Sequence, residues 1–161
     1  MAKVRILVVD DELVIRESLS GWLARDGYQV SVAPSGEQTL ELLKTCSFDI
    51  LLLDIQLEGM SGMEVLDHVK EEYPDIDVIM ITAFGSVPSA VQAMKSKAYD
   101  YILKPFDPDE LGVLIKRLVD LRAKRQENAF LREEVETLTR FESLIGQSRP
   151  MQKIFKLIRD I

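Results

Sequence analysis

The chain has 161 residues, of which 47% are apolar and 29% charged, and its formal net charge is −7. This composition is typical of a folded globular domain and excludes a disordered chain. One cysteine, Cys46, and one histidine exclude an internal disulfide and the usual kind of zinc site. No apolar run is long enough to cross a bilayer or resembles a cleaved signal segment, so we expect a cytoplasmic protein that does not bind membranes.

The charge is distributed unevenly along the chain. Residues 1–120 carry a net charge of −10, and residues 121–161 carry a net charge of +3. Phosphate repulsion makes the acidic part a poor candidate for nucleic-acid binding. We therefore expect no direct contact with nucleic acid, and we expect the last 41 residues to be a structure of a second kind.

Short apolar runs alternate along the chain with segments of helical periodicity. Residues 4–9 are apolar almost throughout, which is typical of a strand buried on both faces. A helical pattern follows at 12–26 and stops at Gly27. Ser35 is expected to cap the next helix, with Cys46 in or near the core, and Pro88 is expected in the first turn of the fourth helix. Further strands are expected at 28–33, 49–53, 78–81 and 99–103.

Five strands that alternate with five helices predict a doubly wound α/β domain. Right-handed crossovers then produce a parallel sheet covered on both faces. The pattern by itself leaves the strand order open. In such sheets, functional residues lie at the carboxyl ends of the strands.

The last helix, which starts after Asp107 or Pro108, has an unusually long pattern. No Gly or Pro occurs from Val113 to Ile145. Its apolar stripe continues with the spacing of a heptad repeat, although the stretch around Lys124 is polar. Both a dimeric helix pair and a solvated linker are compatible with it. The pattern breaks at Phe141, which predicts a loop over 143–150 and a final amphipathic segment. The expected seam consists of Leu121, Asn128, Leu131, Val135 and Leu138.

Charged and hydroxyl residues lie at four of the predicted strand ends. Asp10, Asp11 and Glu12 follow the first strand, and Asp54 follows the third; Thr82 and Lys104 end the fourth and fifth strands. These ends meet at one edge of a parallel sheet, where several carboxylates would repel one another. A hard divalent cation removes that repulsion, and Mg²⁺ accepts such oxygen ligands.

The sequence around these residues resembles the receiver domain of bacterial two-component response regulators. The resemblance is carried by Asp10-Asp11-Glu12, Leu53-Asp54, Ile81-Thr82-Ala83 and Lys104-Pro105-Phe106, and it spans about residues 4–120. It implies a flavodoxin-like (CheY-like) sheet of order 2-1-3-4-5. It also implies a phosphoacceptor switch rather than an enzyme, in which Asp54 takes a phosphoryl group from a sensor histidine kinase.

The resemblance also assigns roles to individual residues. Asp11, Asp54 and the backbone carbonyl of Gln56 would bind Mg²⁺ directly, and Asp10 would act through a water molecule. A second set of residues would hold the phosphoryl group or respond to it: Thr82 and Lys104 as its partners, Tyr101 as a switch aromatic, and Pro105 after a cis peptide bond.

Two further stretches resemble the NtrC class of sigma-54-dependent activators. They are Ala83-Phe84-Gly85-Ser86, with Ala98-Tyr99-Asp100-Tyr101, and the tail Leu144-Ile145-Gly146-Gln147-Ser148. The expected domains are a receiver at 1–120, a dimerisation linker at 121–140 and the start of an AAA+ ATPase at 141–161. The phosphate loop G-x-x-x-x-G-K-S/T is absent from the chain, so we expect no ATP hydrolysis. We expect the unphosphorylated dimer to restrain the ATPase that acts on sigma-54 RNA polymerase.

Three rival interpretations are weaker. A phosphoaspartyl phosphatase of the haloacid-dehalogenase type would need a second aspartate where this chain has Gln56. A constitutive dimerisation module would not need Asp10, Asp11, Asp54, Thr82 and Lys104 together. A Rossmann-type nucleotide site would need glycines where the first strand ends in acidic residues.

Overall fold

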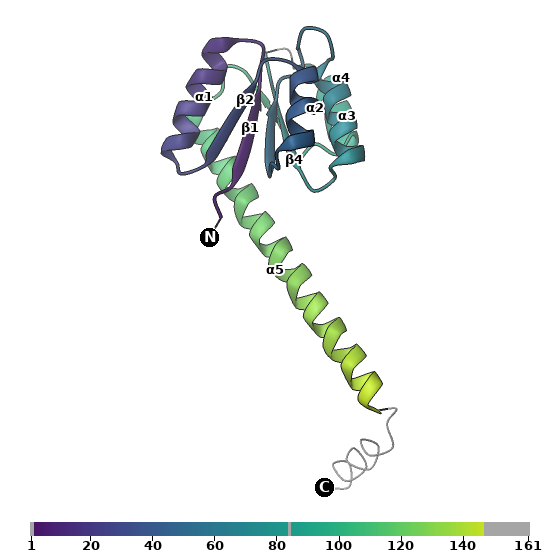
Figure 1. The fold of residues 1–161 in the computed structure, drawn as a ribbon. Helices are drawn as coiled ribbons and strands as arrows, with labels where there is room; N and C mark the ends of the chain where they lie inside the picture. Colours follow the sequence, from purple (N-terminus) through teal and green to yellow (C-terminus); the bar gives the residue numbers. More distant parts are fainter. Residues whose placement is uncertain (1, 84, 147–161) are drawn as a thin grey trace. The chain divides into compact units, whose positions relative to one another are not determined.

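The computed structural model describes residues 2–83 and 85–146, and these form a five-stranded parallel sheet with five helices (Figure 1). The strand order is β2-β1-β3-β4-β5, which confirms the doubly wound topology. The elements are β1 (Arg5–Val9), α1 (Leu13–Arg25), β2 (Gln29–Ala33), α2 (Gly36–Thr45), β3 (Ile50–Leu53), α3 (Gly62–Glu72), β4 (Asp77–Thr82), α4 (Val87–Lys95), β5 (Asp100–Leu103) and α5 (Pro108–Gly146).

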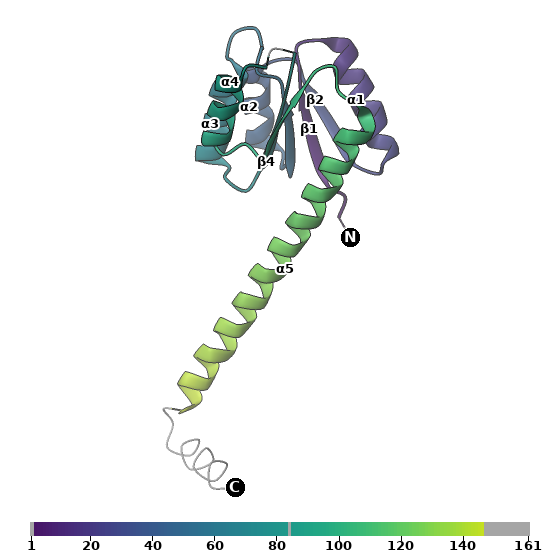
Figure 2. The same ribbon diagram turned by 180° about the vertical axis from the view of Figure 1, so that it is seen from behind.

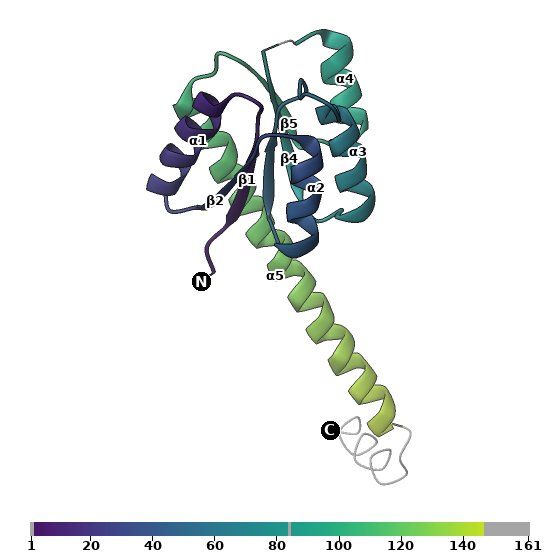
Figure 3. The ribbon, with the colours of Figure 1, turned by 45° about the horizontal axis from the view of Figure 1, so that its top comes forward.

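Helices cover both faces of the sheet. Helix α1 lies on one face, and α2, α3 and α4 lie on the opposite face, as the views from both sides and from above agree (Figures 1, 2 and 3). None of the helices in 2–83 and 85–146 is long and apolar enough to cross a membrane. The chain divides into two compact units, residues 1–108 and 109–161.

The core is built on the three central strands. All residues of β3 and β4 are buried, and so is β1 from Ile6 onward. This explains the near-continuous apolar runs, because strands covered by helices on both faces have no solvent-facing side. The central strands thereby hold their carboxyl ends in a fixed register.

Local signals at the helix ends are largely as predicted. The Ser35 hydroxyl caps α2 by accepting a hydrogen bond of 3.2 Å from the Gln38 N–H. Pro88 lies in the first turn of α4, where a missing N–H costs no intrahelical bond. Ser61 and Glu64 form a reciprocal capping box at the start of α3.

Two expectations were wrong. Cys46 is exposed rather than in or near the core: α2 ends at Thr45, and the backbone of its C-cap, Cys46, is extended, with φ of −128° and ψ of 149°. The backbone of α5 also stays helical to Gly146, although a loop was expected from Ser143. Nothing before Gly146 interrupts the helix, since neither Gly nor Pro occurs from Val113 to Ile145. Residues 147–161, which include most of the predicted ATPase start, lie outside the described residues.

Helix α5 has two parts of different character. Leu111, Ile115 and Leu118 are fully buried at helical spacing. From 123 to 142 every residue is exposed, including the apolar members of the predicted seam, Leu131, Val135 and Leu138. The second part therefore presents an apolar stripe that the residues described in 2–83 and 85–146 leave exposed.

Candidate functional site

The parallel register brings the predicted site residues to one edge of the sheet. The Asp54 N–H donates to the Val9 carbonyl at 3.0 Å, which places Asp54 beside Asp10. The Lys104 N–H donates to the Thr82 carbonyl at 2.8 Å, which places Lys104 beside Thr82. Asp10, Asp54 and Thr82 are all buried, with exposed fractions of 2%, 6% and 0%.

Lys104 lies between the two buried carboxylates. Its Nζ is 2.5 Å from Oδ2 of Asp10 and 3.1 Å from Oδ2 of Asp54, while Oε1 of Glu12 lies 3.8 Å away. Lys104 and Asp10 are separated by 94 positions in the sequence. One half-buried ammonium group thus offsets the repulsion between two buried carboxylates.

The remaining oxygen of each aspartate is held by its own loop. Oδ1 of Asp10 accepts from the N–H of Glu12 at 2.9 Å, and Oδ1 of Asp54 accepts from the N–H of Gln56 at 3.1 Å. Both are local turns in which an aspartate bonds the backbone two residues further on. They orient each carboxylate so that its Oδ2 faces Lys104.

Burial and charge shift the pKa values at this edge. Burial raises the pKa of Asp54 above 3.8, although the Gln56 N–H and Lys104 act in the opposite direction. Burial alone would lower the pKa of Lys104, but its bonds to Asp10 and Asp54 raise it above 10.5. The pKa of Tyr101 is raised above 10.0 by burial and by the Asp54 carboxylate. Burial therefore disfavours the charged form of the Asp54 carboxylate.

The acidic residues after β1 suit a hard cation. One carboxylate oxygen from each of Asp10, Asp11 and Glu12 lies within 4.8 Å of the others. All three donors are oxygens, which is the ligand type that Mg²⁺ prefers. Asp54 and Gln56 lie at the same edge of the sheet. The Asp54 N–H donates a hydrogen bond to Val9 of β1, and the Gln56 N–H donates one to the Asp54 carboxylate. The donor set therefore fits the predicted ion.

The other predicted residues lie close to this edge. Tyr101 is half-buried on β5, opposite Met80 of β4, and the Lys104–Pro105 peptide bond is cis. Lys97, two residues after the end of α4, has φ of +68°. Phe84 lies outside the described residues.

Sequence reasoning missed two contacts that shape the loop after Asp54. Oε1 of Glu37 on α2 accepts a hydrogen bond of 2.8 Å from the N–H of Met60. A Cβ on Gly62 would lie 2.0 Å from the carbonyl oxygen of Asp54, so only glycine lets the start of α3 approach that closely. Neither contact follows from periodicity, because the partners belong to different elements.

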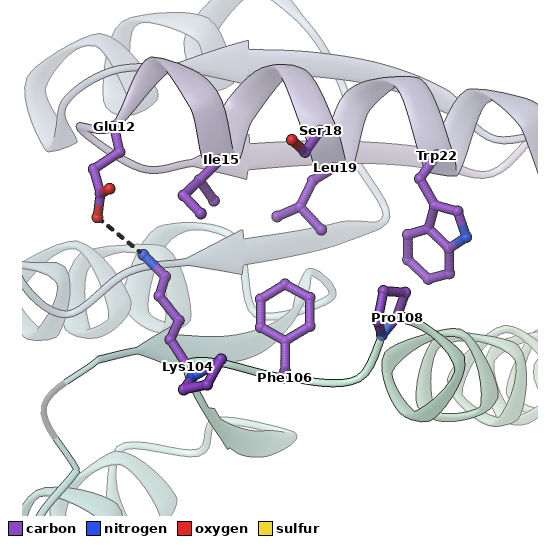
Figure 4. Close-up of a pocket in the computed structure, with 9 residues that line it drawn as sticks. Glu12, Ile15, Ser18, Leu19, Trp22, Lys104, Phe106 and Pro108 are labelled. Atoms are coloured by element: carbon purple, nitrogen blue, oxygen red, sulfur yellow. Dashed lines mark ion pairs between the residues drawn. The ribbon is translucent and has the colours of Figure 1, made fainter.

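An apolar pocket of about 420 Å³ lies beside Lys104. Ile15, Leu19 and Trp22 of α1 face Phe106 across it, and the ion pair between Lys104 and Glu12 marks its end near the site (Figure 4). Its wall is mainly hydrocarbon, with Ser18, Pro105 and Pro108 completing the lining. No sequence pattern predicted this pocket, because its lining comes from α1 and from residues that follow β5.

The fold and the site together define a doubly wound α/β domain with an acidic centre bridged by lysine. A family model described as the response regulator receiver domain matches residues 6–116. That is more than half of the chain, and the chain belongs to this family. The strand order described above is the one that the resemblance implied.

Curated relatives include NtrC-class regulators. The chain is 33% identical over 152 residues to the regulatory protein AtoC of Escherichia coli, covering 94% of this chain and 33% of the relative. It is 33% identical over 153 residues to the DNA-binding transcriptional regulator NtrC of the same organism, with 95% and 32% covered. The chain thus spans about a third of the length of these relatives.

Solved structures of receiver-domain proteins are similar to this chain in fold. A receiver domain protein from Methanospirillum hungatei superposes with a TM-score of 0.75 at 32% identity, covering 77% of this chain and 99% of the other. NtrX from Brucella abortus, solved in complex with ATP, superposes with a TM-score of 0.75 at 32% identity, covering 81% of this chain and 30% of that one. A receiver domain with NtrC-type relatives is therefore established.

Proposed function

We propose that the chain is the phosphorylation-controlled receiver of a longer transcription regulator, with Asp54 as the phosphoacceptor. The observation that carries the proposal is the placement of Lys104 Nζ between Asp10 and Asp54, beside the buried Thr82. A sensor histidine kinase in the cytoplasm is the proposed donor. A structural role alone would not need two buried carboxylates at a strand edge.

The proposed step is an in-line transfer. An oxygen of Asp54 forms a bond to phosphorus while the bond from phosphorus to the donor nitrogen breaks, and the nitrogen keeps the electron pair. Lys104 pairs with one phosphoryl oxygen, and the Thr82 hydroxyl donates a hydrogen bond to another. Asp11, Asp54 and the Gln56 carbonyl would hold Mg²⁺, with Asp10 acting through water. When bound, the ion neutralises the charge of the phosphoryl oxygens.

The test is phosphorylation by acetyl phosphate in the presence of Mg²⁺, followed by intact mass spectrometry. Asp54→Ala is expected to abolish the added phosphoryl mass, and chelation of Mg²⁺ is expected to stop the reaction of the wild type. Asp67→Ala removes an exposed carboxylate on α3 and serves as the matched control. A phosphoryl group that persists on Asp54→Ala would overturn the assignment.

The pocket beside Lys104 supports a protein donor. A kinase that presents its phosphorylated histidine at Asp54 would also cover the apolar walls formed by Ile15 and Phe106. Phe106→Ala is expected to slow phosphorylation by a kinase that is active on the wild type and to leave the acetyl phosphate reaction unchanged. An equal loss with both donors would indicate damage to the site instead.

The process that the receiver controls is proposed from its similarity to the relatives described above. We propose that the longer protein contains an AAA+ ATPase that acts on sigma-54 RNA polymerase, and that the α5 seam joins two copies. Phosphorylation would repack the surface around Tyr101 and α4 and loosen a dimer that holds the ATPase off. A shift from 99% off to 99% on requires about 5.5 kcal/mol of differential stabilisation.

Two measurements test this output. Light scattering with and without beryllofluoride and Mg²⁺ reports the dimer, which is expected to weaken strongly when the chain ends at about residue 121. In the full-length parent, deletion of residues 1–120 is expected to leave an ATPase that is active without a phosphodonor. An inert product at all concentrations would show that the receiver activates instead of restraining.

A further inference from the structure

Arg16 of α1 holds the turn that carries the acidic residues after β1. Its Nη1 donates a hydrogen bond of 2.7 Å to the backbone carbonyl oxygen of Asp10. The Arg16 N–H also donates to the carbonyl of Glu12 at 3.2 Å, which is the first hydrogen bond of the helix. The side chain and the backbone of one residue thus join both ends of the stretch 10–12 to α1.

The bond from Arg16 completes the hydrogen bonding of Asp10. The Asp10 N–H donates to the Ala33 carbonyl at 3.3 Å. Its carboxylate accepts from the Glu12 N–H at 2.9 Å and from Lys104 at 2.5 Å. The carbonyl oxygen accepts from Arg16, so each polar atom of this buried residue has a partner. The position of Asp10 is therefore fixed on all sides.

The carbonyl of Asp10 shares its peptide plane with Asp11. The atoms from one Cα to the next lie in a plane, so a bond that fixes the Asp10 oxygen also fixes the direction in which the chain reaches Asp11. Asp11 is exposed, so packing around its side chain contributes little to its placement. The Glu12 side chain, at the N-cap of α1, makes no capping hydrogen bond. The orientation of Asp11 therefore depends on the bond from Arg16.

We propose that Arg16 is a positioning residue for the metal site, and that it sets the preference of this site for Mg²⁺ over Ca²⁺. This inference rests on the proposed Mg²⁺ ligands, of which Asp11 is one. Mg²⁺ requires nearly ideal octahedral geometry, whereas Ca²⁺ accepts irregular arrangements with longer bonds. A ligand whose peptide plane is fixed suits the smaller ion, which tolerates less displacement of its ligands.

The charge of Arg16 and its positioning role have opposite effects on metal affinity. A guanidinium group near several carboxylates repels a cation, so its removal would tighten binding if charge dominated. The partner of Arg16 is a backbone oxygen, however, whereas Lys104 contacts the carboxylate oxygens themselves. Arg16 is also partly exposed, so solvent and salt screen its charge. Loss of a group that orients a ligand costs about 10- to 100-fold in metal affinity, so we expect the positioning role to dominate.

Calorimetric titration of the chain with Mg²⁺ and with Ca²⁺ tests this role. Arg16→Met removes the donor and the charge; it is expected to raise the Kd for Mg²⁺ about tenfold and the Kd for Ca²⁺ much less. Arg16→Lys keeps the charge and is expected to be intermediate, because an ammonium group lacks the planar fork of arginine. Arg25→Met makes the same change at the exposed end of the same helix and is the matched control.

The two affinities separate the positioning role from its alternatives. Mg²⁺ bound by Arg16→Met as tightly as by the wild type, or more tightly, would overturn the role and leave the proposed phosphoacceptor intact. An equal loss for Mg²⁺ and Ca²⁺ would overturn the proposed selectivity. A wild type that binds no Mg²⁺ would overturn the proposed metal site, and this inference with it.

Thermal unfolding without metal shows whether each variant is folded. Arg16→Met is expected to unfold cooperatively, as the wild type does. If it does not fold, the ratio of the two Kd values in Arg16→Lys decides. A ratio equal to that of the wild type would then overturn the positioning role.

Discussion

The carboxylate of Glu37 accepts a hydrogen bond from the backbone N–H of Met60, with 2.8 Å between Oε1 and N. This bond joins the first turn of α2 to the loop that leaves β3. Gly59, next to Met60, has φ of +78°, and a Cβ there would lie 2.6 Å from the same Oε1. Glu37 therefore holds the loop that carries Gln56, although it lies outside the acidic centre.

Glu37→Ala is expected to raise the Mg²⁺ concentration needed for half-maximal phosphorylation by about tenfold, because supporting groups orient the ligands of a metal site. The rate at saturating Mg²⁺ is expected to change little. Glu37→Gln keeps an acceptor oxygen and is expected to behave more like the wild type. Acetyl phosphate assays over a range of Mg²⁺ concentrations measure this.

Glu41→Ala is the control, since Glu41 lies on the same helix and its carboxylate pairs with the exposed Lys44 at 3.0 Å. An unchanged Mg²⁺ dependence in Glu37→Ala would contradict the positioning role.

Gly62→Ala is expected to destabilise the fold by about 2 kcal/mol, because its Cβ would approach backbone atoms that cannot move aside cheaply. Those atoms are the Asp54 carbonyl oxygen at 2.0 Å and the Ile55 Cα at 2.6 Å. Urea denaturation measures the change. Gly21→Ala in α1 is the control, since nothing lies within 4 Å of its Cβ position and alanine favours a helix. Equal stabilities of the two variants would contradict the close approach.

Asp54→Asn is expected to raise the free energy of unfolding by about 1 kcal/mol at neutral pH without Mg²⁺, because functional sites often hold charges at the expense of stability. Burial raises the pKa of Asp54 above 3.8, so the native state binds a proton at higher pH than the unfolded chain does. The stability of the wild type, relative to the variant, therefore increases as the pH falls through this raised pKa toward 3.8.

The difference in the free energy of unfolding between Asp54→Asn and the wild type should accordingly be largest above the raised pKa of Asp54. It should become smaller as the pH falls. Added Mg²⁺ should also reduce this difference in stability, because it binds the native wild type. Thermal unfolding at several pH values measures both effects. A difference that widens as the pH falls would mean that the pKa is lowered instead.

Lys104→Met is expected to strengthen Mg²⁺ binding several-fold while slowing phosphorylation. Without the ammonium group, the carboxylates of Asp10 and Asp54 repel each other and attract a cation more strongly. The phosphoryl group, however, loses its cationic partner. Calorimetric titration with Mg²⁺ measures the first effect and acetyl phosphate assays the second. Lys95→Met on α4 is an exposed control, and weaker Mg²⁺ binding by Lys104→Met would contradict the electrostatic argument.

The layers of the fold and the acidic edge of the sheet could be predicted from the order of residues along the chain. Apolar runs such as 4–9 identified the buried strands, because a strand covered on both faces needs no polar side. The acidic residues at 10–12 and Asp54 follow such runs, and parallel strands end at one edge, so their convergence could be predicted. The seam of α5 was also visible, since its heptad spacing is a local property of one helix.

Contacts between elements that are distant in the sequence could not be predicted in this way. Glu37 and Met60 meet because α2 and the loop after β3 cover neighbouring parts of one sheet face, and Gly62 approaches Asp54 because of how α3 begins. The exposure of Cys46 depends on where α2 ends relative to its apolar face. Periodicity describes one element at a time, whereas these relationships arise from the packing of one element against another.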